Sequence, residues 1–416
     1  MGDLRYKSAL RNHDVYNIQD LAVKYSTLVD RISGESVDAW GVHYDAIIRR
    51  DAGEDIIVLS VGQETGERTP EPIVQAAIDS LRSGRHHYTA TSGEEQLRAA
   101  IAEHHYAITG QFVDKEQCSV FVGAQNGLFA VAQCLLEGGD DVLLLEPYYT
   151  TYPATFTATG AGLTSVETKS ENSFQPDPDD VIAAITPNTR AIVINSPNNP
   201  TGAIYTRDRL KPIVQACVDR DIWVICDEVY ATLTQLGEFT SPCVLSGADK
   251  VCISVSSLSK SHRMTGWRMG WVVGPKRLSG HLYNLSMCMS YGLPPFIQDA
   301  AVVALRTERK IAATVHETMQ RRAKSFLSAL DGISGVIVHS AVGGMFVVLD
   351  ISALNVSGEK FAQGFLTQHN VSVLPCDGFG PSAAGLLRVS LCEPTERLLI
   401  ASQRLRQYVE QNGWIV

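Results

Sequence analysis

The sequence contains no apolar run long enough to cross a membrane as a helix, so we expect no membrane segment. Its first residues, Met1 to Lys7, also lack the apolar stretch of a signal peptide, which favours a cytoplasmic protein. The nine cysteines show neither a Cys-x-x-Cys pair nor the spacing of zinc ligands. We therefore expect reduced cysteines, several of them buried, and no metal site.

The sequence also lacks a Gly-x-Gly-x-x-Gly segment after a strand, which argues against a nicotinamide enzyme. Acidic residues outnumber basic ones by 45 to 35, and the formal net charge is −10. Because nonspecific nucleic-acid binding needs a basic face, we expect no nucleic-acid partner. The 416 residues, 45% hydrophobic and 19% charged, are typical of a globular protein with room for two domains.

Strands alternate with helical segments from about Gly62 to Pro295. This alternation is typical of an α/β fold, in which a mainly parallel sheet is covered by helices on both faces. We assign residues 61–305 to a large domain of this kind. The segment Trp40–Arg50 also predicts a helix, whereas the first ~25 residues predict an arm or a helix of uncertain order.

Residues 306–416 predict a smaller α+β domain. A long helix that includes Glu308–Leu330 precedes two strands, Gly335–His339 and Met345–Asp350, and Glu396–Asn412 predicts a closing helix. We expect residues 1–60 to supply the N-terminal arm and a part of this small domain.

The segment Ser257–Arg268 carries the strongest chemical signal. It follows Val251–Val255, which predicts a short buried strand, and it sets Lys260 among hydroxyl side chains. A lysine in this position can form an imine with an aldehyde, while Ser257 and Arg268 hold an anionic group. Pyridoxal 5'-phosphate (PLP) is an aldehyde that carries a phosphate. Taken alone, however, a Ser-x-Ser-Lys segment is more often a solvated surface loop.

Two earlier segments supply an anion site and an aromatic face. Val120–Asn126 predicts a strand, a turn of small residues and the start of a helix, whose free N–H groups attract anions. We assign the backbone of Ala124 and Gln125, with the Gln125 side chain, to the phosphate. After the strand Val142–Leu145, Tyr149 can stack against a pyridine ring. An ordinary core tyrosine explains Tyr149 equally well.

Two further strands end in polar residues. Asn199 follows the strand Ala191–Asn195 and can donate a hydrogen bond to the phenolate oxygen of PLP, which Tyr230 also reaches. Asp227 ends the strand Ile222–Cys226, where it can keep a pyridine nitrogen protonated. Taken alone, Asn199 is explained equally by an ordinary Asn-Pro turn, and Asp227 by a helix N-cap. All five signals in this order predict a PLP site.

These motifs resemble the class I/II aminotransferases of PLP fold type I, from about Trp40 to the C-terminus. The resemblance rests on Asn199–Gly202, Asp227–Tyr230 and Ser257–Arg268. It implies PLP as cofactor, a seven-stranded, mainly parallel sheet in the large domain, and a homodimer with shared active sites.

The resemblance also implies roles for single residues. Lys260 matches the lysine that binds the PLP aldehyde, and Asp227 matches the partner of the ring nitrogen. Tyr88 matches a tyrosine that reaches the phosphate of the neighbouring subunit. Arg388 and the backbone of Gly62 match the groups that bind the substrate α-carboxylate, and an arginine can hold a carboxylate through two parallel hydrogen bonds.

Within this family, the chain is most similar to arginine–pyruvate transaminases, which implies an amino acid and a 2-oxo acid as substrates. This similarity is carried by residues 284–292, 295–301, 343–346 and 379–385. Glu64, Glu67 and Asp377 are candidates for binding an arginine side chain, although solvated loop charge explains them at least as well. The loop after Gly62 departs from the family's Gly-x-Pro-x-Phe-x-x-Pro type of segment, which leaves the side-chain preference open.

Other activities share the same cofactor residues. The alternatives are an aminotransferase with an aromatic, alanine or aspartate donor, a C–S lyase, and an amino-acid oxidase, since a fold and cofactor site do not fix the reaction. A PLP-dependent sensor of a transcription regulator would need a fused basic DNA-binding segment, and the ~40 residues before the match are too few for one.

Overall fold

The computed structural model describes residues 24–33, 40–64, 66–307, 310–339 and 342–414. Most of the N-terminal arm predicted for the first residues therefore lies outside the described residues, as does Glu308. In the part of the chain that is described, no helix combines the length and the apolar character that a membrane span requires.

The largest element is a seven-stranded sheet with the order β2-β8-β7-β6-β5-β3-β4. Neighbouring strands from β7 to β4 are parallel, whereas β8 runs antiparallel to both β2 and β7. The prediction of a mainly parallel sheet is confirmed. The strands are β2 (Cys118–Val122), β3 (Asp141–Glu146), β4 (Gly162–Glu167), β5 (Thr189–Asn195), β6 (Trp223–Asp227), β7 (Cys252–Ser257) and β8 (Met269–Val273).

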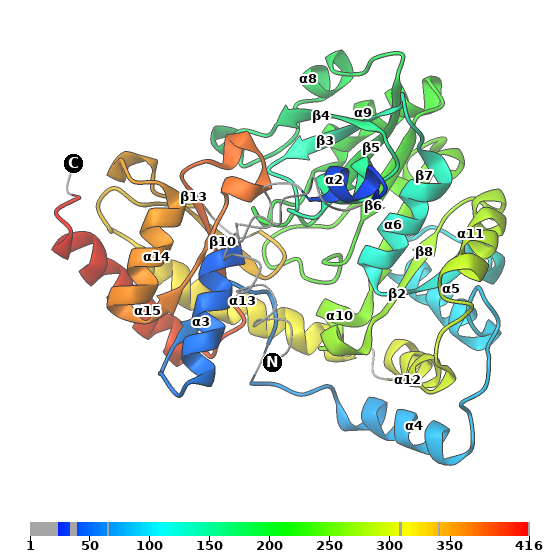
Figure 1. The fold of residues 1–416 in the computed structure, drawn as a ribbon, viewed down its shortest axis with the longest axis horizontal. Coiled ribbons are helices and arrows are strands. Elements are labelled where there is room, and N and C mark those ends of the chain that lie inside the picture. Colours follow the sequence, from blue (N-terminus) through cyan, green and yellow to red (C-terminus); the bar gives the residue numbers. More distant parts are fainter. Residues whose placement is uncertain (1–23, 34–39, 65, 308–309, 340–341, 415–416) are drawn as a thin grey trace.

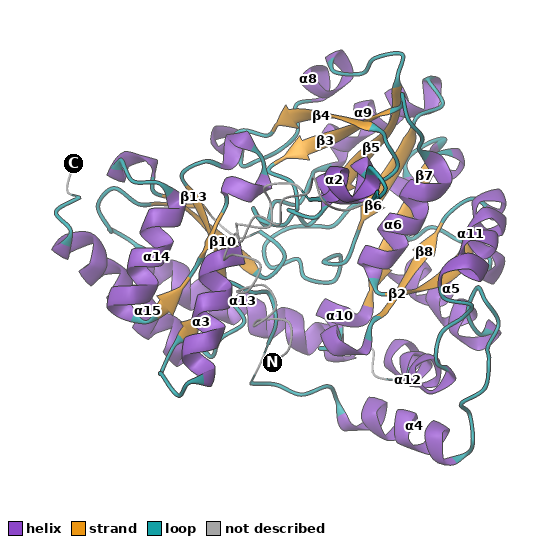
Figure 2. Cartoon of the chain, in the orientation of Figure 1, coloured by secondary structure: helices purple, strands orange, loops and turns teal. Residues whose placement is uncertain are grey.

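Helices cover both faces of this sheet (Figure 2). Along β3, Val142 and Leu144 pack in one apolar cluster, while Leu143 and Leu145 pack in another, because successive strand residues point to opposite faces. Both clusters are buried, which is why the central strands are continuously apolar. The helices of this part are α4 (Glu71–Arg82), α5 (Glu95–Thr109), α6 (Ala124–Leu135), α7 (Tyr152–Thr157), α8 (Pro178–Ala183), α9 (Arg207–Asp219), α10 (Leu258–Ser261), α11 (Lys276–Met289) and α12 (Pro295–Arg306).

A second, antiparallel sheet of four strands has the order β12-β13-β10-β9. In Figure 1 its strands β10 and β13 lie with α3, α14 and α15 at the left, and the long helix α13 runs from this group towards α10. The strands are β9 (Ile337–His339), β10 (Phe346–Asp350), β12 (Leu374–Pro375) and β13 (Leu386–Ser390), and the helices are α3 (Gly41–Asp51), α13 (Lys310–Leu330), α14 (Gly358–His369) and α15 (Thr395–Gln411).

A two-stranded parallel pair joins distant parts of the chain. Strand β1 (Ile57–Val58) pairs with β11 (Val371–Ser372), so the segment before the large sheet lies against the C-terminal third. The short helix α2 (Leu28–Ile32) instead packs on α7, where the Arg31 guanidinium donates to the Thr157 and Ala158 carbonyl oxygens at 2.9 and 3.1 Å. The N-terminal part of the chain therefore contacts both the C-terminal third, through β11, and the large domain, through α7.

The start of α6 approaches β8 closely at Gly270. A Cβ atom added to Gly270 would lie 2.5 Å from both the Ala124 nitrogen and the Gly123 carbonyl carbon. Only a glycine allows this contact, because the backbone atoms of α6 cannot move aside as a flexible side chain can. The position of the α6 N-terminus therefore depends on Gly270.

We expect Gly270→Ala to lower the free energy of unfolding by about 1–3 kcal/mol, because the added methyl overpacks against backbone. Urea denaturation would measure the change. Gly280→Ala is the matched control, since Gly280 lies on the exposed face of α11 with nothing within 4 Å of the added Cβ. This control should be neutral or stabilising by up to about 1 kcal/mol. Equal stability of the two variants would contradict the argument.

Candidate active site

A pocket of about 270 Å³ opens at the carboxyl ends of the parallel strands. This is the edge at which open α/β sheets bind their ligands. The pocket brings together ten of the residues predicted from the sequence: Gly62, Ala124, Gln125, Tyr149, Asn199, Asp227, Tyr230, Ser257, Lys260 and Arg268. Arg388 lies behind this lining, and Tyr88 lies outside the pocket.

Lys260 lies on the short helix α10, directly after β7, rather than on the loop that the sequence suggested. Its Nζ donates a hydrogen bond to the Gly62 carbonyl oxygen at 2.8 Å. Burial lowers the pKa of the Lys260 ammonium from 10.5 to about 8, and the charges of Arg388 and Arg268 act in the same direction. Part of the amine is therefore neutral near neutral pH, as a nucleophile or a base requires.

Asp227 ends β6 with its carboxylate inside the pocket. Its Oδ2 accepts a hydrogen bond from the Tyr152 hydroxyl at 2.6 Å, and its Oδ1 accepts one from the Val229 N–H at 3.3 Å. Burial raises the pKa of Asp227, whereas the Tyr152 hydrogen bond and the Lys260 charge lower it. A cationic partner in the pocket would favour the ionised carboxylate further.

Tyr152 is a site residue that the sequence reasoning missed. In this segment the sequence predicts a role only for Tyr149, as a ring that stacks against a pyridine. In the structure Tyr149 lines the pocket and meets Tyr152 edge to face, with 5.8 Å between the ring centroids. Tyr149, in the loop before α7, thus faces the pocket, while Tyr152 at the start of α7 also lines it and orients the Asp227 carboxylate.

The opposite end of the pocket is an anion site. Gly123 precedes α6 with φ of 82° and has no side chain to cap the first-turn N–H groups of Ala124 and Gln125. The Arg268 guanidinium lies so close that a Cβ at Gly123 would be 2.2 Å from its Nη2. Ser257 joins this end of the pocket as the N-cap of α10. Helix N-termini and a guanidinium together suit a phosphate.

The Gln125 side chain differs from the expectation that it faces the phosphate. Its Nε2 donates to Thr155 Oγ1 at 2.7 Å, and its Oε1 accepts from Thr151 Oγ1 at 2.8 Å. These two hydrogen bonds tie the start of α6 to α7. What Gln125 offers to an anion is therefore its backbone N–H, together with that of Ala124.

Arg388 extends from β13 towards the pocket and is only 1% exposed. Its Nη1 donates to Asn199 Oδ1 at 2.9 Å and its Nη2 donates to the Ser60 carbonyl oxygen at 2.8 Å. The guanidinium carbon also lies 4.1 Å from the centre of the Phe346 ring. Among the described residues, the Arg388 Nε atom has no hydrogen-bond partner although it is buried. A fixed, desolvated guanidinium with spare donor capacity suits a carboxylate ligand.

Asn199 and Tyr230 also line the pocket. The Asn199 Oδ1 atom is engaged by Arg388, which leaves the Nδ2 group as the donor towards the pocket. Its backbone N–H donates to Asn195 Oδ1 at 2.8 Å, so the turn after β5 is fixed. Tyr230 is buried against Phe346, with 6.1 Å between the ring centroids, and burial raises the pKa of its hydroxyl.

Glu64 occupies an ion triad rather than an open position. Its Oε2 atom lies 2.7 Å from Arg263 Nε and its Oε1 atom lies 2.8 Å from Arg322 Nη1, and the side chain is only 3% exposed. Two of the protein's own guanidinium groups therefore occupy the carboxylate considered for substrate binding. Glu67 pairs more loosely with Arg263, at 3.6 Å, and stays exposed. Asp377 is also exposed.

Tyr88 is 88% exposed and contacts Tyr291, with 5.4 Å between the ring centroids. Within one chain it does not contribute to the pocket. This placement is compatible with the expectation that Tyr88 acts on a neighbouring subunit, which stays a prediction.

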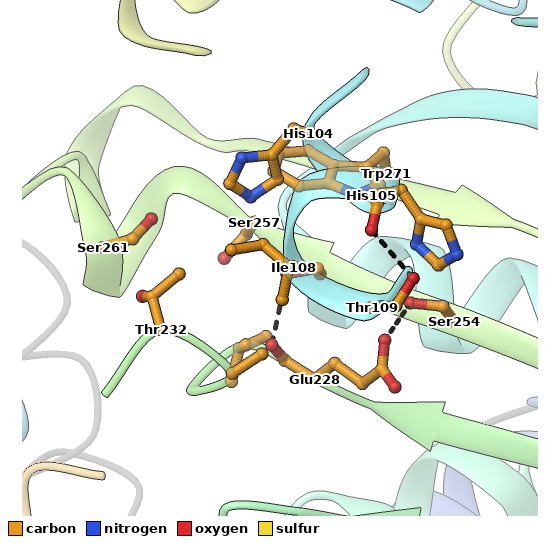
Figure 3. A pocket seen from close by; sticks show the side chains of 13 residues that line it. His104, His105, Ile108, Thr109, Glu228, Thr232, Ser254, Ser257, Ser261 and Trp271 are labelled. Carbon is orange, nitrogen blue, oxygen red and sulfur yellow. Dashed lines mark hydrogen bonds between the residues drawn. The ribbon is translucent and has the colours of Figure 1, made fainter. Parts of the chain in front are cut away.

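Behind the pocket, a small polar cavity lies against the other face of β6 and β7 (Figure 3). The Glu228 carboxyl faces it and accepts hydrogen bonds from the hydroxyls of Ser254 and, at 2.5 Å, Ser241. Burial raises the pKa of Glu228 from 4.5 to about 8, so this carboxyl is mostly protonated at neutral pH. The neighbours Asp227 and Glu228 thus lie in two different environments because strand residues alternate between faces.

Comparison with known proteins agrees with this geometry. Residues 54–405 match the family described as aminotransferase class I and II. The arginine–pyruvate transaminase AruH of Pseudomonas aeruginosa is 46% identical over 383 residues, which are 92% of this chain and 97% of that protein. An aspartate aminotransferase of Pyrococcus horikoshii is 32% identical over 86% of this chain and 91% of its own length.

Solved structures give the same result. The aspartate aminotransferase of Thermus thermophilus, determined with maleate, superposes with a TM-score of 0.87 at 31% identity, over 93% of this chain and all of that one. This chain belongs to the class I and II aminotransferases. It is a PLP-dependent transaminase with the type I fold, as the sequence motifs predicted.

The pocket fits PLP in size and in the type of group at each end. A buried amine faces an uncapped helix N-terminus with a guanidinium, and a carboxylate lies where a pyridine nitrogen needs an anionic partner. The glycine at position 123 leaves the space in front of Arg268 that a side chain would fill.

We expect Glu228→Gln to stabilise the protein increasingly as the pH rises from 5 to 8. The folded chain keeps a proton on Glu228 that the unfolded chain has released above pH 4.5, so the wild type loses stability across this window. The difference between variant and wild type should grow by at most about 1.4 kcal/mol per pH unit. Denaturant unfolding at several pH values measures it.

The same change at the exposed Glu410 controls for the loss of one negative charge. A Glu228→Gln difference that stayed constant or shrank with rising pH would show that Glu228 is ionised in the folded protein.

Proposed function

We propose that the protein transfers the α-amino group of L-arginine to pyruvate. The observation that carries this proposal is the 46% identity to an arginine–pyruvate transaminase over nearly the whole of both chains. The pocket supports the reaction class, because it combines a buried lysine, a buried carboxylate and a buried guanidinium.

We propose that Lys260, which would also hold the PLP aldehyde, takes the proton from the substrate Cα atom. PLP, when bound, supplies an aldehyde for the amino group and a ring that takes up electrons as the Cα–H bond breaks. The same Nζ would then hold this proton until it is returned, so one residue would serve both proton transfers. Burial supports this role, since it keeps part of the amine neutral and able to accept a proton.

We propose that the other residues bind and orient. The Asp227 carboxylate, held by Tyr152, keeps the pyridine nitrogen protonated. The backbone of Ala124 and Gln125, with Ser257 and Arg268, binds the phosphate, and Tyr88 joins it from a neighbouring subunit. Asn199 and Tyr230 bind the phenolate oxygen, and Tyr149 stacks on the ring. Arg388 and Gly62 bind the substrate carboxylate, which fixes one pose of the amino acid.

We extend the proposal to the oligomeric state, the domain division and the location of the protein. We propose a homodimer, supported by the exposed aromatic pair Tyr88 and Tyr291. We propose a division into residues 1–60, 61–305 and 306–416, supported by the separate positions of the two large sheets. A cytoplasmic location is favoured by nine unpaired cysteines, which persist in a reducing compartment.

An aspartate donor is the second candidate. An aspartate aminotransferase is a 32% identical relative, and the Arg263 side chain lines a small recess beside Lys260, where a cation could meet a second carboxylate. Arg263 is already paired with Glu64, which weakens this alternative.

A half-reaction without any oxo acid tests the donor. Arginine, lysine, alanine, glutamate, aspartate and phenylalanine would each be mixed with PLP-loaded protein. We expect arginine to convert the absorbance of lysine-bound PLP to that of pyridoxamine phosphate fastest, and pyruvate to restore it. Conversion only by another amino acid would refute the arginine assignment. Release of ammonia, a thiol or peroxide in place of an amino product would refute the transaminase.

Lys260→Ala should lower turnover by at least about 10²–10⁴-fold, since it removes the proton-transfer group. It should also abolish the absorbance of lysine-bound PLP. Lys276→Ala is the matched control, because Lys276 is an exposed lysine paired with Asp114 and should leave turnover unchanged. Normal turnover by Lys260→Ala in steady-state assays would overturn the role of Lys260.

A further inference from the structure

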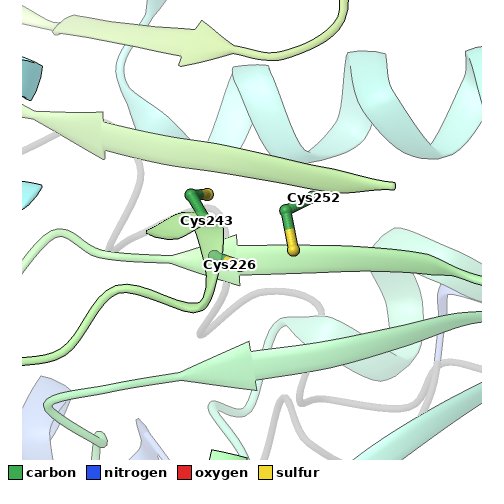
Figure 4. A group of neighbouring side chains, drawn as sticks. All are labelled: Cys226, Cys243 and Cys252. Carbon is green, nitrogen blue, oxygen red and sulfur yellow. The ribbon is translucent and has the colours of Figure 1, made fainter. Parts of the chain in front are cut away.

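Three cysteines that are distant in sequence meet in the core beneath the active site. Cys226 lies on β6, Cys252 lies on β7, and Cys243 lies on a short 3-10 turn, Pro242–Val244. Their sulfur atoms all lie within 4.8 Å of one another (Figure 4). Within the described residues this is the one group of three cysteine, histidine or acidic side chains whose ligand atoms are so close.

The sheet and one serine fix this arrangement. Cys252 pairs with Val224 in the register of β6 and β7, so Cys226, two residues further along β6, points to the same face. The Ser241 Oγ accepts a hydrogen bond from the Cys243 N–H at 3.2 Å and donates one to Glu228 at 2.5 Å. Cys243 is therefore linked through Ser241 to Glu228, which directly follows β6. The sequence spacing of the three residues matches no metal motif, so only the fold reveals the group.

The surroundings restrict what the three thiols can bind. All three belong to an apolar core cluster with residues such as Leu210 and Ile213, and none is more than 5% exposed. A complex that leaves net negative charge here would be costly, because charge is poorly solvated in an apolar interior.

The net charge of the complex with three thiolates indicates which ion this site would bind. Three thiolates bound to a monovalent copper ion leave two negative charges, and three bound to zinc leave one, with zinc still short of its usual fourth ligand. A trivalent centre with three thiolates is neutral and needs no fourth ligand. We propose that Cys226, Cys243 and Cys252 form a binding site for trivalent arsenic.

The reaction with arsenous acid is a simple exchange of ligands. Three As–S bonds form, three As–O bonds and three S–H bonds break, and three water molecules leave. No electrons are transferred, so no oxidant or reductant is required. Arsenous acid is itself neutral and small, so it brings no charge into this apolar core.

Arsenic binding at this site should also change the active site. Cys226 directly precedes Asp227, and Ser241 links Cys243 to Glu228. Drawing the three sulfur atoms together therefore moves the end of β6, on which Asp227 lies. We expect arsenic binding to shift the absorbance of bound PLP.

The test uses the reduced, PLP-loaded protein, incubated with arsenite and desalted, with retained arsenic measured by elemental mass spectrometry. We expect one arsenic atom per chain in the wild type and its loss in Cys243→Ala and Cys252→Ser. Cys217→Ala and Cys288→Ala are the matched controls, one buried in the same cluster and one exposed, and both should retain arsenic. Circular dichroism and the PLP absorbance before arsenite would establish that each variant is folded.

Several results would overturn the proposal. These are no retained arsenic in the wild type, retention that does not depend on Cys243, or loss in the Cys288→Ala control. Zinc and copper(I) provide a further comparison under the same conditions. Tighter retention of either ion through the same three cysteines would refute the charge argument and with it the assignment to arsenic.

Discussion

The buried guanidinium of Arg388 connects the parts of the chain on which the site depends. From β13 in the four-stranded sheet it donates to Asn199, in the turn after β5 of the large sheet, and to the Ser60 carbonyl, just after β1. Each contact satisfies a polar group that would otherwise be buried without a partner. The charge is expensive to bury, and burial lowers the pKa of Arg388, so its position makes sense as a binding group for a carboxylate.

Asp227 and Glu228 are neighbours at the end of β6, but their carboxyls lie in two different chemical environments. Asp227 faces the pocket, where burial raises its pKa and the Tyr152 hydrogen bond and the Lys260 charge lower it. Glu228 faces the serine-lined cavity, where burial favours the protonated form. The two adjacent carboxyls therefore have different hydrogen-bond partners, because their side chains point to opposite faces at the end of β6.

Much of the site could be predicted from the sequence, because parallel strands end at a common edge and the polar residues follow those ends. This holds for Asp227 after β6, Asn199 after β5 and Lys260 after β7. Side-chain partners could not be predicted in the same way. The contact of Tyr152 with Asp227 depends on the path of α7, and the engagement of Gln125 with two threonines depends on how α7 packs against α6. Glu64 finds Arg322, 258 residues away, only through the packing of α13.

The pairing of β1 with β11 has a consequence for synthesis on the ribosome. Ile57 pairs with Val371, so β1 stays without its partner strand until more than 300 further residues have been added, which takes on the order of 15–60 s at typical rates. All seven strands of the large sheet precede residue 274, so the nascent chain carries the residues proposed to bind the cofactor well before Arg388 emerges. During that interval Ser60 and Asn199 have no guanidinium to bind. The cofactor side of the pocket is thus available to fold before the carboxylate side exists.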